Sequence, residues 1–185
     1  RDDIVCNFDF SKKHTEGWDW TWQVPRADFD NLLVEELTKK GVDISFEHEV
    51  VAVDFDEVGN STTKVLDENG HSYNIHAKFI VDSSGWGRVL PRLLDLDKPS
   101  TIPEHSSIFG HVKDINRPQG EEVKLITFDV LSKDTWLWVI PFSNGDTSIG
   151  FVGKNEFIDS FEGTTEERLR AMLKESDYYH ERFKE

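Results

Sequence analysis

The alternating stretch WLWVIP, residues 136–141, constrains the fold more strongly than any other part of the sequence. Its period of two places both tryptophans and Ile140 on one face of a strand. Asn144-Gly145 follows and favours a tight reversal, so that residues 147–152 can return as the partner strand. We therefore predict a hairpin with a bulky aromatic face, which either fills a core or lines a site.

Composition narrows the class of protein. The 185 residues suffice for one domain with a substantial core, or for a large piece of a bigger domain. Asp and Glu number 36 against 21 Lys and Arg, a formal net charge of −15. This balance argues against nucleic acid and against an anionic membrane surface as partners. With 13 Phe and 6 Trp, the chain is expected to fold rather than to be disordered.

Cysteine content and apolar runs bear on the compartment. Cys6 is the single cysteine, so no intrachain disulfide can form, and a reducing cytoplasm is the expected location. An inert thiol is favoured over a nucleophile because no paired base is visible. No apolar run approaches the roughly 20 residues that span a bilayer. The chain lacks an initiator Met, and we expect it to be cut from a longer protein.

The first part of the chain mixes strand and helix patterns. Residues 18–24 alternate three tryptophans with polar residues and predict a strand. Residues 28–40 carry apolar residues at helical spacing, and Gly41 is expected just past the helix end. The alternation changes phase between residues 42–46 and 51–55, which favours two strands that belong to different sheets.

Two turn signals predict a meander. Gly59-Asn60 and Asn69-Gly70 separate three short alternating runs, which we interpret as antiparallel strands. Residues 79–81 then form an expected buried strand, followed by a glycine-containing turn and a short helix. We expect residues 42–46 and 79–81 to be parallel neighbours, with the meander of residues 49–76 as their crossover. In open α/β sheets, a turn beyond the carboxyl end of such a strand is where ligands bind.

The second half is richer in strand patterns. The sequence predicts one antiparallel sheet from residues 108–112, 123–130, 135–140 and 147–152. A last helix is expected from Thr164, because Thr164 and Glu167 form a capping-box pattern. That helix should bury Leu169, Met172 and Leu173.

Several common catalytic and binding motifs do not occur. The sequence has no G-x-G-x-x-G, no G-x-x-x-x-G-K-[ST] and no G-x-S-x-G motif. No histidine pair has the H-x-x-x-H spacing, and the histidines of the meander are interpreted as solvated strand residues rather than ligands. We therefore predict no metal site.

Three stretches together resemble one enzyme family. They are VPRADFDNLLVEELTKKGVD, FIVDSSGWGRVLPRLL and WLWVIPFSNGDTSIGFVG. In this order, over roughly residues 18–153, they resemble the flavin-dependent, tryptophan-halogenase-like branch of the FAD-dependent oxidoreductases. WLWVIP matches the W-x-W-x-I-P motif of those halogenases, whereas the other two stretches are shared more widely with flavin monooxygenases.

The resemblance implies a fold and a division of the chain. The implied fold is of the α+β or α/β class: part of a glutathione-reductase-type FAD-binding fold, plus an antiparallel sheet of the substrate domain. Residues 1–24 and 100–160 would form the substrate-side sheet region. Residues 25–99 would form a partial FAD-binding region with the meander, and residues 161–185 a C-terminal helix.

The resemblance also implies chemistry. Reduced FAD and dioxygen would oxidise halide to hypohalous acid, which would pass through a tunnel to a small organic, aromatic substrate. A separate flavin reductase would supply the reduced FAD. In such enzymes the catalytic lysine and the glycine-rich unit that holds the ADP part of FAD lie N-terminal to the matched stretches. We therefore assign no catalytic lysine, and we expect the isolated chain to be inactive and colourless.

Two sets of site residues follow from the resemblance. The aromatic wall, which would separate flavin from substrate and transfers no protons, consists of Trp136, Trp138, Ile140 and Pro141. The cofactor set, which would approach FAD, consists of Arg26, Val51, Asp82, Ser84 and Gly85. Other interpretations stay open, namely a core strand for the wall, a capped turn around Ser84 and a surface position for Arg26.

Two other functions stay open as well. The chain could belong to a flavin monooxygenase or reductase of the same superfamily. It could also be a non-catalytic, β-rich module that uses its aromatic face to hold an apolar ligand or partner.

Overall fold

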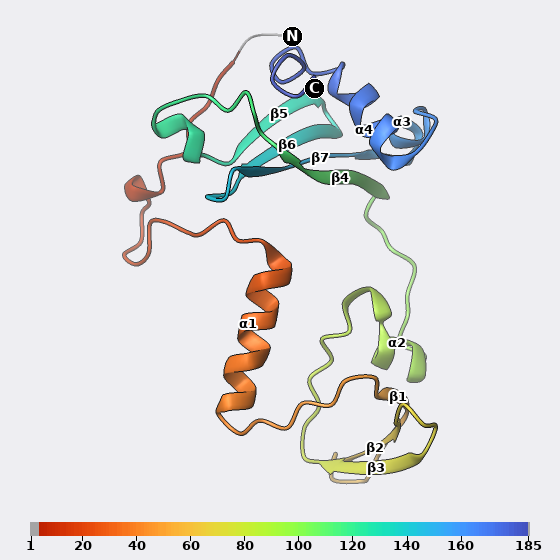
Figure 1. The fold of residues 1–185 in the computed structure, drawn as a ribbon. Helices are drawn as coiled ribbons and strands as arrows, with labels where there is room; N and C mark the ends of the chain where they lie inside the picture. The colour runs from red at the N-terminus through yellow and green to blue at the C-terminus, as the bar shows by residue number, and fades with distance from the viewer. Residues whose placement is uncertain (1–3, 185) are drawn as a thin grey trace. The chain divides into compact units, whose positions relative to one another are not determined.

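The computed structural model of the protein describes residues 4–184 and divides into two compact units (Figure 1). One unit combines the chain up to Leu32 with the chain from Pro103 onward, and the other runs from Leu33 to Ile102. Helix α1, Arg26–Lys39, crosses the boundary between them. No helix in the described part of the chain is long and apolar enough to cross a membrane.

The second unit contains the predicted meander. Its antiparallel sheet has the order β1-β2-β3 and consists of β1 (Glu49–Phe55), β2 (Ser61–Leu66) and β3 (Ser72–Ala77). Both hairpins turn through a glycine with positive φ, +88° at Gly59 and +79° at Gly70. In each turn an aspartate, Asp56 or Asp67, accepts hydrogen bonds from backbone N–H groups two and four residues further on. These turns match the sequence signals because they depend on local geometry alone.

Helix α1 confirms the predicted helix and its end. Gly41 has a φ of +80°, and its N–H donates to the carbonyl of Thr38. The next N–H, of Val42, donates to the carbonyl of Leu37 at 3.1 Å, which completes a Schellman motif. The apolar stripe of this helix is not covered, however, since none of its residues is buried. The helical spacing of the sequence therefore identified the helix but not a partner for its apolar face.

Three predicted strands are not strands in the structure. Residues 18–24, 42–46 and 79–81 belong to no sheet, so the predicted parallel pair and its crossover are wrong for this chain. The side chains of Phe79 and Val81 are 82% and 76% exposed. Parallel strands are stable mainly in sheets that are covered on both faces, and the described residues provide no such cover. Both observed sheets are antiparallel.

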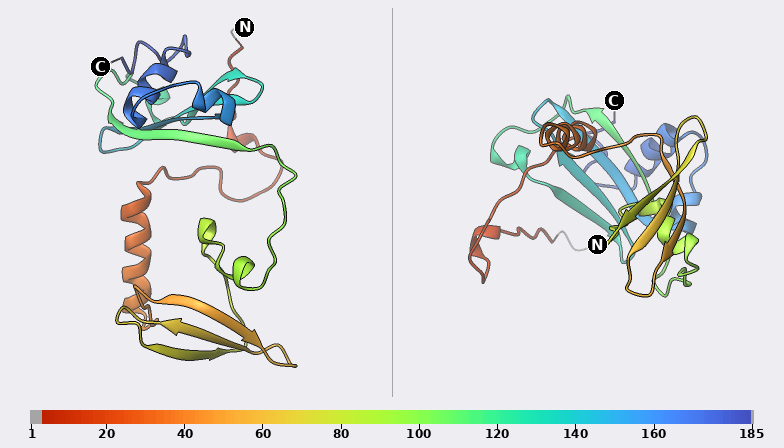
Figure 2. Two further views of the ribbon diagram at one scale, coloured as in Figure 1. Left: turned by 90° about the vertical axis from the view of Figure 1, so that its right-hand side faces the viewer. Right: turned by 90° about the horizontal axis from the view of Figure 1, so that it is seen from below.

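The first unit is built on the predicted four-stranded antiparallel sheet (Figure 2). Its order is β4-β7-β6-β5, and the strands are β4 (His105–Lys113), β5 (Thr127–Ser132), β6 (Thr135–Pro141) and β7 (Asp146–Lys154). Strand β5 begins later than predicted because residues 121–124 form a short 3-10 helix.

Two helices and the C-terminal segment cover one face of this sheet (Figure 1). The helices are α3 (Asn155–Asp159) and α4 (Thr165–Leu173). The structure confirms the capping box of Thr164 with Glu167. The buried side chains that the sheet contributes to this covered face are Ile108, Leu137, Val139, Ile149 and Phe151. Those that the helices and the C-terminal segment contribute are Ile158, Leu169, Met172, Leu173, Tyr179 and Phe183.

Further short helices lie outside this core. They are η1 (Phe10–Lys12), η2 (Gly85–Gly87), α2 (Val89–Leu93) and η3 (Glu121–Lys124).

A buried ion cluster closes one end of the covered face. The fully buried carboxylate of Asp114 accepts hydrogen bonds from Arg182 Nε at 3.2 Å and from Thr147 Oγ1 at 2.7 Å. Arg117 pairs with the same carboxylate and also donates to the carbonyl of Phe142 at 2.8 Å. The cluster thereby joins the end of β4, the β6–β7 hairpin and the C-terminal segment.

Candidate functional site

The wall tryptophans lie on the open face of the four-stranded sheet, opposite the helices. The residues of this open face are Ser107, Phe109, His111, Phe128, Val130, Trp136, Trp138, Ile140, Ser148, Gly150 and Val152. Cross-strand pairing places Phe109, Gly150, Trp138 and Phe128 in one row across all four strands. Because side chains alternate between the faces, the neighbours of each tryptophan along β6 point into the core instead.

Trp138 has a defined environment within this row. Its indole Nε1–H donates to Ser148 Oγ at 3.2 Å, and its ring centroid lies 5.9 Å from that of Phe109. Trp136 lies 6.1 Å from the ring of His105, and both tryptophans are partly exposed. The indoles are therefore not enclosed by the side chains of their own unit, as a purely structural core would require.

The four predicted wall residues do not share one face. Trp136, Trp138 and Ile140 alternate on the open face, whereas Pro141 is buried and has the parity of the core residues Leu137 and Val139. Pro141 ends β6 at the hairpin to β7. The role of the wall beside flavin stays a prediction.

Most of the cofactor set lies in the second unit, in the turn before α2. Asp82 Oδ1 accepts the N–H of Ser84 at 2.8 Å, and its Oδ2 accepts the N–H of Leu90 at 3.0 Å. Hydrogen bonds from Ser84, then from the N–H of Leu90, hold the pKa of Asp82 below its ordinary value. Ser84 Oγ accepts the N–H of Val89 at 2.8 Å. The side chains of Asp82 and Ser84 are therefore occupied in holding the turn in shape. A ligand at this turn would meet backbone groups instead of these side chains.

Gly85 adds open space to this turn. Its φ of +52° lies in the left-handed region, and a Cβ placed on it would have no atom within 4 Å apart from those of its two chain neighbours. A bound group can therefore approach the backbone closely at this point.

The remaining members of the cofactor set differ in their surroundings. Val51 lies at an irregularity of β1, where the pairing with β2 shifts between Val50 and Ala52. A residue left out of a ladder in this way has backbone groups available for other partners. Arg26, at the start of α1, makes a bidentate pair with Asp30, and both N···O distances are 3.0 Å. A ligand of Arg26 would have to compete with this carboxylate.

The structure also places residues on the open face that the sequence patterns did not single out. Ser148 and Gly150 from β7, Phe109 from β4 and Phe128 from β5 surround Trp138. No local sequence signal identifies them, because the registers of three strand pairs determine which residues lie near Trp138.

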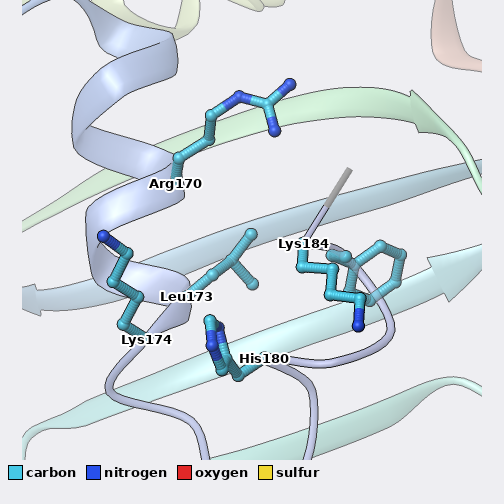
Figure 3. Close-up of a pocket in the computed structure, with 6 residues that line it drawn as sticks. Arg170, Leu173, Lys174, His180 and Lys184 are labelled. Atoms are coloured by element: carbon cyan, nitrogen blue, oxygen red, sulfur yellow. The ribbon is translucent and has the colours of Figure 1, made fainter.

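A pocket of about 200 Å³ lies outside both predicted sets, between α4 and the C-terminal segment (Figure 3). Its lining residues are Arg170, Leu173, Lys174, His180, Phe183 and Lys184. Two of its cations are already paired, Arg170 with Glu166 at 2.9 Å and Lys184 with Glu181 at 2.8 Å. Among the residues that the structure describes, no group of three or more His, Cys, Asp or Glu could hold a metal ion.

Comparisons with known proteins agree on a family. The profile of the FAD binding domain family matches residues 6–176. A chlorinase of 1H-pyrrole-2-carbonyl-[peptidyl-carrier protein] from Pseudomonas fluorescens is 27% identical in an alignment of 182 residues that covers 95% of this chain and 40% of that protein. The chain thus spans well under half the length of this curated relative.

Solved structures give the same result. A flavoprotein/dehydrogenase from Cytophaga hutchinsonii is 46% identical with a TM-score of 0.87, over 96% of this chain and 43% of that one. The myxobacterial chondrochloren halogenase, described as a variant of FAD-dependent halogenases, is 25% identical with a TM-score of 0.71, over 91% of this chain and 38% of its own. Since the family profile matches nearly the whole chain, this protein belongs to the FAD binding domain family, its cofactor is FAD, and its relatives include flavin-dependent halogenases.

Proposed function

We propose that this chain is part of an FAD-dependent halogenase that acts on a small aromatic substrate with halide, dioxygen and reduced FAD from a separate reductase. The single observation that carries the proposal is the placement of the W-x-W-x-I-P tryptophans. Both lie partly exposed on the open face of the sheet, away from the core that stabilises the unit. The chlorinase relative, whose name specifies a pyrrole substrate, supports an aromatic ring as the target.

The residues of the turn before α2 fit a bound FAD. Gly85 leaves room for a close approach to the backbone, and Asp82 and Ser84 hold the turn in shape through bonds to backbone N–H groups. The break in the β1–β2 register at Val51 suits contact with the adenine, and Arg26 would contribute a cation if it released Asp30. When bound, FAD supplies the redox chemistry, and the chain supplies position and shape.

The aromatic wall acts by exclusion and orientation. The indoles of Trp136 and Trp138 form a rigid apolar surface that orients an aromatic ring by stacking. They also keep the substrate from direct contact with the flavin, so that it is halogenated rather than oxygenated. Neither indole transfers a proton in this proposal.

Trp136→Phe and Trp138→Phe in the intact protein test the wall. Because Phe keeps much of the apolar area and both positions are partly exposed, the melting temperature should stay nearly unchanged. The ratio of halogenated product to hydrogen peroxide should fall, with oxygenated product or unused peroxide in its place. Loss of stability with an unchanged ratio would instead assign both tryptophans to packing.

A pair of matched glycine variants tests the cofactor turn. Gly85→Ala and Gly59→Ala impose the same kind of strain, since both glycines have positive φ and open space around a placed Cβ. In the intact protein, Gly85→Ala should weaken FAD binding in a flavin fluorescence titration, whereas Gly59→Ala should not. Equal affinity of both variants would argue that the turn does not touch the cofactor.

A second candidate function rests on one observation. The solved structure that is 46% identical is described as a flavoprotein/dehydrogenase, not as a halogenase. A flavin oxidoreductase without halogenation would oxidise, reduce or oxygenate its substrate and give no halogenated product at any halide concentration. Product analysis with chloride and with bromide separates the two functions.

A further inference from the structure

Gly150 lies beneath the indole of Trp138 at the centre of the open face. A Cβ placed on Gly150 would lie 2.5 Å from Trp138 Cη2 and 2.5 Å from Phe109 Cβ. Real Cβ atoms do not approach other heavy atoms this closely, so any larger residue would force a displacement. Gly150 is not among the residues with positive φ, and its need for glycine therefore comes from space rather than from backbone conformation.

The contact explains the direction of the indole. Trp138 belongs to β6, and the outer edge of its benzene ring reaches across Gly150 of β7 towards Phe109 of β4. Along the same edge of the indole, Nε1–H donates to Ser148 Oγ at 3.2 Å. One contact fixes how closely the ring approaches the sheet, and the other fixes its rotation.

We propose that Gly150 and Ser148 are positioning residues that hold the indole of Trp138 against the sheet and so set the shape of the aromatic wall. This inference rests on the proposed function of the wall. Neither residue is required to touch cofactor or substrate, because both act through Trp138. A Cβ at position 150 would press on both Phe109 Cβ and the indole. It would lift the indole away from β7 and into the space that a substrate would use.

The test uses the intact protein labelled with 5-fluorotryptophan and observed by fluorine NMR. The resonance of Trp138 is identified by its loss in Trp138→Phe. Gly150→Ala should shift this resonance and lower the product-to-peroxide ratio about tenfold, as expected for a reacting geometry displaced by a fraction of an ångström. Ser148→Ala should shift the same resonance, and Ser148→Thr, which keeps the hydroxyl, should return it towards its original position.

Gly110→Ala is the matched control. Gly110 lies on the neighbouring strand β4, and a Cβ there would make an ordinary contact, 3.5 Å from Leu169 Cδ2 on the covered face. Gly110→Ala should change neither the Trp138 resonance nor the product-to-peroxide ratio. If Gly150→Ala prevents folding, the double variant with Trp138→Phe should restore it in part, since Phe lacks the outer ring atoms that meet position 150.

The outcomes separate the inference from the function on which it rests. A Trp138 resonance that Gly150→Ala leaves in place overturns the positioning role. The positioning role is also overturned if Gly150→Ala shifts the resonance but leaves the product-to-peroxide ratio unchanged, provided that Trp138→Phe does change this ratio. If Trp138→Phe also leaves the ratio unchanged while the resonance shifts, the wall function fails, whereas the control of the indole by Gly150 is upheld.

Discussion

The two faces of the four-stranded sheet are built from the same strands but have opposite surroundings. On the covered face, Leu137 and Phe151 are fully buried against helices and the C-terminal segment. On the open face, Phe109 and Phe128 are 56% and 61% exposed. Both faces are apolar and aromatic, so hydrophobicity does not distinguish them. The difference shows that the covered face forms the core of this unit, whereas side chains of the open face stay partly exposed.

Among the variants that compare the two faces, Phe151→Ala should cause the largest loss of stability. The side chain is fully buried at the centre of the covered face, and its removal leaves a cavity. We expect the free energy of unfolding to fall by about 4 kcal/mol, measured by urea denaturation. A loss as small as that of a residue on the open face would show that the covered face is not the core.

Asp114→Asn should cause the second-largest loss of stability. The change leaves Arg182 and Arg117 without the buried carboxylate to which both are bonded. We expect a loss of about 3 kcal/mol in the free energy of unfolding, because breaking a buried ion pair leaves uncompensated charge. The urea midpoint reports this loss. A value near that of wild type would mean that the cluster does not close the covered face.

The same carboxylate should make stability depend on acid pH. Burial acts to raise the pKa of Asp114, but hydrogen bonds from Arg182 and Thr147 outweigh it, so the pKa lies below the ordinary 3.8. A lowered folded-state pKa contributes stability that is fully present above 3.8 and is lost as the pH falls through the folded pKa. Unfolding from about pH 6 down to about pH 2 should therefore show a steeper loss in wild type than in Asp114→Asn. Parallel curves would contradict this assignment.

Thr164→Ala should lower the free energy of unfolding by less, because it weakens only the start of α4, one of the helices on the covered face. Thr164 is the N-cap of α4, and its Oγ1 accepts the N–H of Glu167. This helix buries Leu169 and Met172. Loss of the cap should cost about 1 kcal/mol in thermal or urea unfolding. Thr164→Ser, which keeps the oxygen, should remain close to wild type, and an equal loss in both variants would exclude capping as the cause.

Phe128→Ala should have the smallest effect on stability. Its side chain belongs to the open face and is more than half exposed, so about 0.5 kcal/mol is the expected loss. Urea denaturation beside Phe151→Ala gives the direct comparison of the two faces. A loss comparable to that of Phe151→Ala would show that the open face is packed in solution.

The sequence by itself determined the features that depend on neighbouring residues. The cap at Thr164, the glycine end of α1 at Gly41 and the meander turns at Gly59 and Gly70 all occur where the patterns predicted them. The alternation in residues 136–140 correctly placed both tryptophans and Ile140 on one face of a strand. These features follow from φ preferences and hydrogen bonds within a few residues, so a local pattern is sufficient to predict them.

Only the tertiary structure decided the register, the covered face and the strands that form. A two-residue turn centred on Asn144-Gly145 would pair Trp138 with Phe151, whereas the longer observed loop pairs it with Gly150. Alternation defines two faces but does not say which one helices cover, since both faces here are apolar. Residues 42–46 and 79–81 have strand patterns yet join no sheet. Pairing and burial depend on residues far away in the sequence, and no local pattern contains that information.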